Sequence, residues 1–176
     1  KPGHFIILRV DELGERIPLT IVDHDETTID IIYQKLGYST RLLSTKGIGD
    51  TISDIVGPLG ESAEIHVVNN ILAVAGGVGA APLYPQLKAY YEQGVNIDLV
   101  IGARSKDYLI LIDEFKAICN NVYMCTDDGT VGFHGFVTEK VNELLKSKIY
   151  DHSIAIGPLV MMKYVVIMNK KFSLKT

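Results

Sequence analysis

Residues 71–93, ILAVAGGVGAAPLYPQLKAYYEQ, join an apolar strand, a glycine cluster and an amphipathic helix with almost no residues between them. Glycines let the backbone turn sharply there, and the free N–H groups that begin the following helix can face an anion. Pro82 fits the first helical turn, where its missing N–H breaks no helical bond. The arrangement is typical of a turn that holds a dinucleotide pyrophosphate, although glycine clusters also form purely structural turns. The residues of the expected turn are Gly76, Gly77, Val78 and Gly79.

Composition indicates an ordinary globular protein, because 47% of the 176 residues are apolar and 22% are charged. The net charge of −4, without clustered Lys and Arg among aromatics, argues against nucleic acid as a partner. The longest apolar stretch, Ile71 to Leu83, is too short to span a membrane. Cys119 and Cys125 lie outside any metal or redox spacing, and no leader is evident. We therefore expect an internal fragment of a cytoplasmic protein, with no metal site and no membrane partner.

Hydrophobic periodicity divides the chain near residues 66–70. From Ile71 onward, strands alternate with helices, which predicts a doubly wound parallel sheet. Short strand candidates broken by glycines and charged turns precede Ile71, which predicts a small antiparallel barrel. In the first part we expect strands at Phe5–Val10, Leu19–Val22 and Thr28–Gln34 and a helical turn near Thr40–Ser44; in the second, strands at 71–75, 97–103, 122–126 and 153–156 and helices at 82–93, about 108–119, about 136–146 and 159–169.

Polar and glycine residues follow the expected parallel strands, at the edge where open α/β sheets bind ligands. The second strand lacks the acidic residue that usually holds a ribose hydroxyl. Arg104 and Lys106 instead place positive charge where a 2′-phosphate would lie, which favours NADP over NAD; ordinary solvated loop charges are the alternative. Besides the glycine turn, the strand-end residues are Arg104, Ser105 and Lys106; Thr126, Asp127, Asp128 and Gly129; and Gly157 and Pro158.

Six short motifs, in this order along the chain, resemble the ferredoxin-NADP reductase superfamily over essentially the whole sequence. Within it, the chain most resembles the electron transfer subunits of dihydroorotate dehydrogenase and the related flavin subunits of NADH-dependent reduced ferredoxin:NADP oxidoreductase, also called sulfide dehydrogenase. The motifs are Arg16-Ile-Pro-Leu-Thr20, Gly37-Tyr-Ser-Thr40, Gly57-Pro-Leu-Gly60, Ala75-Gly-Gly-Val-Gly79, Thr126-Asp-Asp-Gly129 and Ile156-Gly-Pro158.

The resemblance implies that residues 1–68 form an FAD-binding barrel, incomplete at its N-terminus, and that residues 69–176 form an NAD(P)-binding domain. It implies that Arg16 meets the FAD pyrophosphate and that Thr20 lies against the isoalloxazine, as the candidate catalytic residue. Tyr33 as a half-buried strand aromatic and Ser39 as an ordinary helix cap are the alternatives. The implied flavin residues are Arg16, Pro18, Leu19 and Thr20; Ile32, Tyr33 and Gln34; and Ser39 and Thr40, the pair that holds the pyrophosphate.

The five histidines are scattered and suggest no acid–base site. The resemblance further implies hydride transfer between NAD(P)H and FAD, with the protein positioning the two coenzymes. Electrons would then pass to a [2Fe–2S] cluster, whose four cysteine ligands follow the nucleotide domain and lie outside this chain. A catalytic partner subunit is expected, with ferredoxin as a further candidate. Ile156 stands where many members have cysteine, which favours the ferredoxin:NADP oxidoreductase type. A noncatalytic dinucleotide-binding or assembly domain and a stand-alone flavin reductase are the alternative functions.

Overall fold

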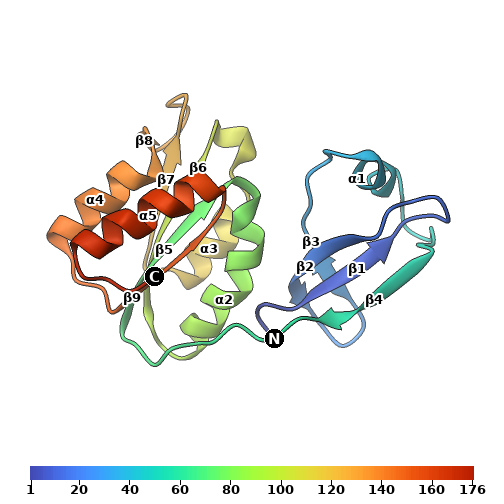
Figure 1. Cartoon of the computed structure of the whole chain (residues 1–176), viewed down its shortest axis with the longest axis horizontal. Helices are drawn as coiled ribbons and strands as arrows, with labels where there is room; N and C mark the ends of the chain where they lie inside the picture. The colour runs from blue at the N-terminus through green and yellow to red at the C-terminus, as the bar shows by residue number, and fades with distance from the viewer. The chain divides into compact units, whose positions relative to one another are not determined.

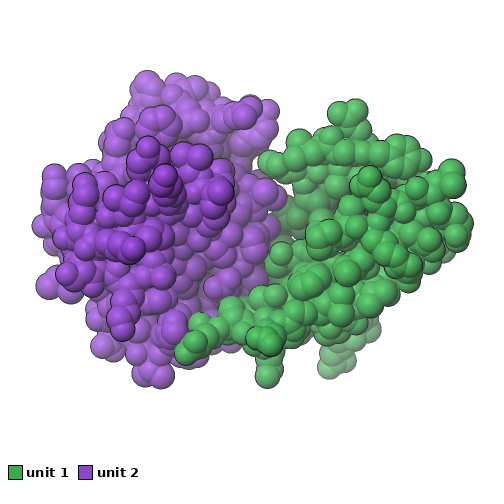
Figure 2. All heavy atoms as spheres, viewed as in Figure 1, with its two compact units in different colours: residues 1–64 green, residues 65–176 purple.

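The computed structural model describes residues 1–176, which divide into two compact units, residues 1–64 and residues 65–176 (Figures 1 and 2). Each unit contains one β-sheet. No helix combines the length and the apolar character that crossing a bilayer requires. The predicted combination of an antiparallel unit followed by a parallel α/β unit is confirmed.

Unit 1 is a four-stranded antiparallel sheet in the order β3-β2-β1-β4, with one short helix (Figure 1). Its core forms because alternate residues of β1 point to one face, where Ile6 and Leu8 pack against Leu43 of the helix. Its elements are β1 (Phe5–Arg9), β2 (Ile17–His24), β3 (Ile29–Ile31), α1 (Tyr38–Leu43) and β4 (Asp54–Leu59).

The sequence does not predict strand β4, because Gly57 and Pro58 interrupt its apolar pattern. The structure explains why residue 57 is a glycine: a Cβ at this position would lie only 2.7 Å from Cγ2 of Ile6 on the neighbouring strand. The expected strand over residues 28–34 is shorter in the structure, where β3 ends at Ile31.

Unit 2 is a five-stranded parallel sheet in the order β8-β7-β6-β5-β9 (Figure 1). The chain runs from β5 through β6 and β7 to β8 on one side, and then crosses to place β9 on the other side of β5. Its elements are β5 (Asn70–Gly76), η1 (Gly77–Gly79), α2 (Ala80–Glu92), β6 (Asn96–Ala103), η2 (Lys106–Tyr108), α3 (Ile112–Ile118), β7 (Asn121–Thr126), β8 (Phe133–His134), α4 (Val137–Ser147), β9 (His152–Ile156) and α5 (Leu159–Lys171).

Strand β5 is buried on both faces, as expected for the centre of a doubly wound sheet. Ile71, Ala73 and Ala75 pack into one core beneath helices α2 and α3, whereas Leu72 and Val74 pack into a second core beneath α4 and α5. Helices α4 and α5 lie side by side on their face of the sheet (Figure 1). The glycine turn therefore follows a strand that is packed on both faces.

Three details of unit 2 differ from expectation. The helix predicted over about 108–119 is a 3-10 turn followed by α3, because Leu111 adopts the left-handed conformation at φ 59° and separates them. Helix α2 begins at Ala80 rather than Pro82, so the proline still lies in its first turn. The two-residue strand β8 is too short to leave a periodic pattern in the sequence.

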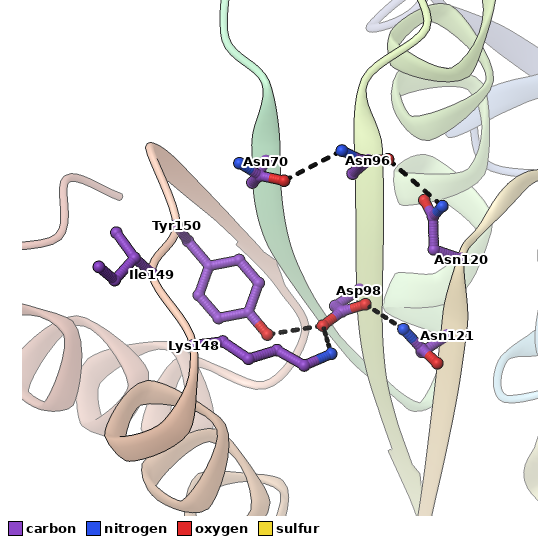
Figure 3. A pocket seen from close by; sticks show the side chains of 8 residues that line it. All are labelled: Asn70, Asn96, Asp98, Asn120, Asn121, Lys148, Ile149 and Tyr150. Carbon is purple, nitrogen blue, oxygen red and sulfur yellow. Dashed lines mark hydrogen bonds and ion pairs between the residues drawn. The ribbon is translucent and has the colours of Figure 1, made fainter.

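An ion pair with further polar groups fixes the crossing from α4 to β9 (Figure 3). The carboxylate of Asp98, on β6, accepts hydrogen bonds from Lys148 Nζ at 2.6 Å, Tyr150 Oη at 2.7 Å and Asn121 Nδ2 at 2.7 Å. Lys148 and Tyr150 lie in the α4–β9 connection. We call these four residues the amino-end cluster, because they line a 390 Å³ cavity near the amino ends of the strands.

The amino-end cluster predicts an acid-sensitive contribution to stability. Burial alone would raise the pKa of Asp98, but hydrogen bonds from Lys148, Asn121 and Tyr150 outweigh it and lower that pKa. A lowered folded-state pKa contributes stability above the ordinary value of about 3.9, and that contribution is lost as the pH falls below it. Asp98→Asn should therefore destabilise the chain by about 1–3 kcal/mol near neutral pH, and by less at about pH 3. Denaturant titration at several pH values measures both quantities.

Asp113→Asn is the matched control, because Asp113 is an exposed carboxylate whose ion pair with Lys116 spans 3.4 Å on the surface of α3. It should change the unfolding free energy by about 0.5 kcal/mol or less. A difference between wild type and Asp98→Asn that stays constant from about pH 5 to about pH 3 would contradict the prediction.

Candidate functional site

The candidate site in unit 2 begins where two backbone turns meet at the carboxyl ends of β5 and β9. Ala75 pairs with Ile156, so the next residues of both strands are neighbours. A Cβ on Gly79 would collide with the carbonyl oxygen of Ile156, and one on Gly157 would lie 2.9 Å from the amide nitrogen of Gly76. The turns approach this closely because neither side carries a Cβ, and together they form one continuous backbone surface.

Donor groups are available on this surface. Gly77 has φ 55°, and no other group lies within 4 Å of where its Cβ would stand, so the turn faces open space. Helix α2 begins without a side-chain cap and without an acidic residue in its first turn. The 3-10 turn η1 runs directly into α2, and carbonyls of Gly77 and Val78 accept the backbone N–H groups at its end, so the helical amides that lack acceptors are those of the glycine turn itself. The predicted turn is therefore open and electropositive, as an anion site requires.

The turns after β6 and β7 are joined to one another. The amides of Asp127 and Asp128 donate to the carbonyls of Ala103 and Arg104, at 3.1 and 3.2 Å. The amide of Lys106 donates to Thr130 Oγ1 at 2.9 Å. The structure thus brings together the predicted strand-end residues of β6 and β7 as one rim.

The side chains of this rim have different roles. Arg104 and Lys106 are exposed, and neither side chain makes a hydrogen bond or an ion pair, so both charges are available to a ligand. Asp128 accepts bonds from the hydroxyl and amide of Thr130, which lower its pKa and close the turn. The buried hydroxyl of Thr126 exchanges hydrogen bonds with the backbone of Val131 and shapes the same turn.

The expected flavin residues of unit 1 divide into those on one face of β2 and those packed elsewhere. Arg16, Pro18 and Thr20 are alternate residues of the β2 segment, so their side chains share the face away from the core. The side chain of Leu19 packs into the core, so Leu19 presents only its backbone to that face. Arg16 Nη1 donates to Asp54 Oδ2 at 2.7 Å. Ile32, Tyr33 and Gln34 follow β3, and Tyr33 packs partly against the core of unit 1.

Ser39 and Thr40 differ in what their hydroxyls do. Thr40 Oγ1 accepts from the amides of Leu36 and Gly37, at 3.0 and 3.1 Å, and thereby holds the start of α1. Ser39 is buried with 3% of its surface exposed, and its Oγ has no hydrogen-bond partner. An unpaired buried hydroxyl is costly, so Ser39, unlike Thr40, retains an unmet hydrogen-bonding group.

Sequence reasoning misses three residues that the structure places beside predicted ones. Met161 lies against Gly76, where its Sδ would be 2.6 Å from an added Cβ. Asp54 forms an ion pair with Arg16, and Arg9 on β1 is the residue directly opposite Asp54 in the register with β4. Alternation from Ile6 and Leu8 gives a signal for Arg9, but the pairing with the distant strand β4 has none.

Side-chain nucleophiles and metal ligands do not gather in the chain. Burial raises the pKa of Cys119 to about 12 and that of Cys125 to about 11, so both thiols stay protonated near neutral pH. No three His, Cys, Asp or Glu side chains lie close enough to hold a metal ion together. What the arrangement offers is binding: an anion-receptive turn in unit 2 and a polar strand face in unit 1.

Comparison with known proteins agrees with the predicted resemblance. A model of the oxidoreductase NAD-binding domain matches residues 73–166. The chain is 46% identical over 174 residues to the dihydroorotate dehydrogenase B (NAD(+)) electron transfer subunit homolog of Thermotoga maritima, covering 98% of this chain and 61% of the relative. It is 34% identical to the probable dihydroorotate dehydrogenase B (NAD(+)) electron transfer subunit of Methanocaldococcus jannaschii, covering 99% and 65%.

Among solved structures, the chain is similar to one from a study of flavin-based electron bifurcation by the NADH-dependent reduced ferredoxin-NADP oxidoreductase. The two share 44% identity and a TM-score of 0.90 over 99% of this chain and 63% of the other. The chain thus spans less than two thirds of the length of each of these three relatives. The predicted superfamily resemblance and fold class are confirmed by these matches.

Gly79→Ala should test the contact between the two turns. The added Cβ meets backbone atoms of Ile156 and Gly157, which cannot move aside as a flexible side chain could. We expect a loss of about 1–3 kcal/mol in the free energy of unfolding and a fall of about tenfold in NAD(P)H affinity, because the turn is forced off β9. Calorimetric titration with NADH and NADPH measures the affinity.

Gly47→Ala is the control, since the only atom within 4 Å of its added Cβ is Asp50 Oδ2, at 4.0 Å. Wild-type nucleotide affinity in Gly79→Ala would show that the close approach is not needed for binding.

Proposed function

The chain belongs to the oxidoreductase NAD-binding domain family, and from this premise we propose that it is the flavin- and nicotinamide-binding part of an electron transfer subunit. In this proposal, residues 1–68 hold FAD and residues 69–176 hold NAD(P)H. The activity is hydride transfer between the two coenzymes, followed by electron transfer to a partner. The observation that carries the proposal is the paired glycine turns after β5 and β9, at the point where the strand order reverses.

The nucleotide half follows from what these turns can bind. Ligands of open parallel sheets lie beyond the carboxyl ends of the strands, at the reversal of strand order. The residues proposed to hold the pyrophosphate there are Gly76, Gly77, Val78 and Gly79, with Gly157 and Pro158 as the neighbouring wall. Arg104 and the turn of Thr126, Asp127 and Asp128 are proposed to form the rim around the adenosine part.

The flavin half rests on unit 1. Arg16, Pro18 and Thr20 share one face of the β2 segment, which supports a single ligand in contact with all three. The unpaired buried hydroxyl of Ser39 supports a phosphate or hydroxyl partner near the start of α1. Both observations fit FAD, and a protein that only senses a dinucleotide has no use for them.

The chemistry divides between coenzymes and protein. When both are bound, the nicotinamide and the flavin supply hydride transfer, and the flavin links a two-electron donor to one-electron acceptors. The chain contributes binding and orientation: the amides of α2 and the glycine turn fix the pyrophosphate, and Arg16 fixes the flavin phosphates. We propose Thr20 as the residue in contact with the flavin ring, with its hydroxyl as a hydrogen-bond donor.

Partners of the whole protein follow from the relatives. Two of them are named electron transfer subunits, which supports a separate catalytic subunit as the partner. A [2Fe–2S] cluster needs four ligands, and this chain has only Cys119 and Cys125. We therefore propose that the cluster ligands belong to a part of the protein outside residues 1–176. The structural relative is a reduced ferredoxin-NADP oxidoreductase, which supports ferredoxin as a second candidate partner.

Flavin uptake and reduction test this function directly. The purified chain is incubated with FAD and separated from the excess, and we expect it to retain the yellow oxidised flavin. In the absence of oxygen, NADPH or NADH should then reduce the bound flavin and remove its yellow colour. Retained FAD that neither nucleotide reduces would favour a noncatalytic binding domain. Full activity of the whole protein with a soluble dye, but no dependence on a partner subunit or cluster, would favour a stand-alone flavin reductase.

Arg104→Ala tests the choice of nucleotide. The names of the relatives include NAD(+) for some and both NADH and NADP for another, so the family itself does not settle this choice. If the unpaired guanidinium meets a 2′-phosphate, its removal should weaken NADPH binding by about 1.5–3 kcal/mol, the range for charged hydrogen bonds, and leave NADH unchanged. Dissociation constants for both nucleotides decide the matter.

Lys116→Ala, which removes an exposed positive charge from α3, is the control for general electrostatics. Equal losses of NADPH and NADH affinity in Arg104→Ala would refute the contact with a 2′-phosphate.

A further inference from the structure

On the face of the unit 1 sheet that lies opposite its core, side chains of the same kind line up across neighbouring strands. Ile6, Leu8 and Val10 of the β1 segment pack into the core, so Ile7 and Arg9 lie on the other face. In the same way Ile17 and Leu19 of β2 face the core, and Arg16 and Pro18 lie opposite. Both strands therefore place an apolar and a basic residue together on the non-core face.

Strand register aligns these residues across three strands. Ile7 pairs with Pro18 on β2 and with Val56 on β4, which makes an apolar row. Arg9 pairs with Asp54 on β4, and Arg16 follows the Leu8–Ile17 pair in the β1–β2 register, opposite Arg9. We call Arg16, Arg9 and Asp54 the charged row. It runs beside the apolar row at the spacing of two residues along a strand, about 7 Å.

The charged row contains one cation that is held and one that is not. Arg16 and Asp54 lie on strands on either side of β1, so their 2.7 Å ion pair spans Arg9. Arg9 Nε is buried and has no hydrogen-bond partner. The nearest carboxylate to Arg9 Nη2 is that of Glu12, at 3.7 Å, and the Glu12 side chain is 84% exposed. A pair of this kind is weak, so Arg9 retains an unmet charged donor.

We propose that Arg9 is a second phosphate-binding residue of the flavin site and that Asp54 is the positioning residue of Arg16. This inference rests on the proposed function and extends it to residues outside the flavin motif. The apolar row fits the flat ring of a flavin, and the charged row fits the phosphates attached to it. Arg9 Nε meets no acceptor on the chain, and 26% of the Arg9 side chain is exposed, so a phosphate can reach the guanidinium.

Asp54 has a definite role in this arrangement. Its carboxylate accepts only from Nη1 of Arg16, which leaves Nη2 and Nε of the fork free to donate. Holding one edge of the planar guanidinium fixes the direction of the other, so less side-chain freedom is lost when phosphate binds. Asp54 also offsets the repulsion between the two neighbouring arginines while no ligand is bound.

The test is the FAD dissociation constant of the chain and its variants, followed by fluorescence titration. Arg9→Gln should weaken FAD binding about tenfold, the equivalent of about 1.4 kcal/mol for a partly exposed charged hydrogen bond. Lys116→Gln, which removes the same charge from α3, should leave FAD binding unchanged. The flavin-free melting temperature of Arg9→Gln should equal or exceed that of wild type, because the substitution removes an unpaired buried donor.

Asp54→Asn separates positioning from simple charge. If Asp54 orients Arg16, its neutral isostere should weaken FAD binding severalfold; if it only repels the phosphates, the same change should tighten binding. Wild-type FAD affinity in Arg9→Gln, or a flavin-free melting temperature well below wild type, would overturn the role of Arg9. Tighter FAD binding by Asp54→Asn would overturn the role of Asp54. A wild-type chain that binds NAD(P)H but no FAD would instead refute the proposed flavin function itself.

Discussion

The nucleotide half of the molecule depends on the approach of two backbone turns without side chains between them. Strands β5 and β9 are hydrogen-bonded neighbours, so the turns that follow them are separated by about one strand spacing, roughly 4.8 Å. From these adjacent ends, α2 leaves toward one face of the sheet and α5 toward the other. Only Gly79 and Gly157 allow both departures at this distance, because a Cβ on either would enter the backbone of its neighbour. The open glycine turn at the start of α2 is a consequence of this geometry.

The rest of unit 2 supplies a rigid base for that contact. Alternate side chains of β5 pack into two separate hydrophobic cores, so this central strand is packed on both faces. The amino-end cluster ties the crossing connection to β6 and β7, at the end of the sheet opposite the glycine turns. Paired polar groups thus lie at one end of the strands, and the unpaired charges of Arg104 and Lys106 lie at the other. Such a division is expected where a binding site carries groups that destabilise the free protein.

The sequence predicts well what is local and poorly what depends on pairing. The strands of unit 2 are apolar runs that end in glycine or polar residues, so both their positions and the strand-end residues are predictable. Leu111 breaks the expected helix before α3 because its left-handed conformation has no sequence signature for a leucine. Strand β4 escapes prediction because Gly57 and Pro58 obscure its pattern. Without β4, neither the ion pair of Arg16 nor the neighbours of Arg9 can be deduced, since register between distant strands is a property of the folded sheet.

The groups that the two units offer to an anion differ, and topology explains the difference. A parallel sheet directs all its strand ends to one edge, where backbone amides and a helix start can face a phosphate without any charged side chain. An antiparallel sheet uses its backbone donors in the ladder and offers ligands only the side chains of a face. On the face that carries Arg9 and Arg16, the only positive groups that unit 1 offers are these side chains, and two arginines on adjacent strands repel each other. The carboxylate of Asp54 offsets that repulsion in the free protein by its ion pair with Arg16. Asp54 does not also pair with Arg9, whose buried Nε has no hydrogen-bond acceptor. The proposed binding of a phosphate would place a negative charge beside this unpaired guanidinium.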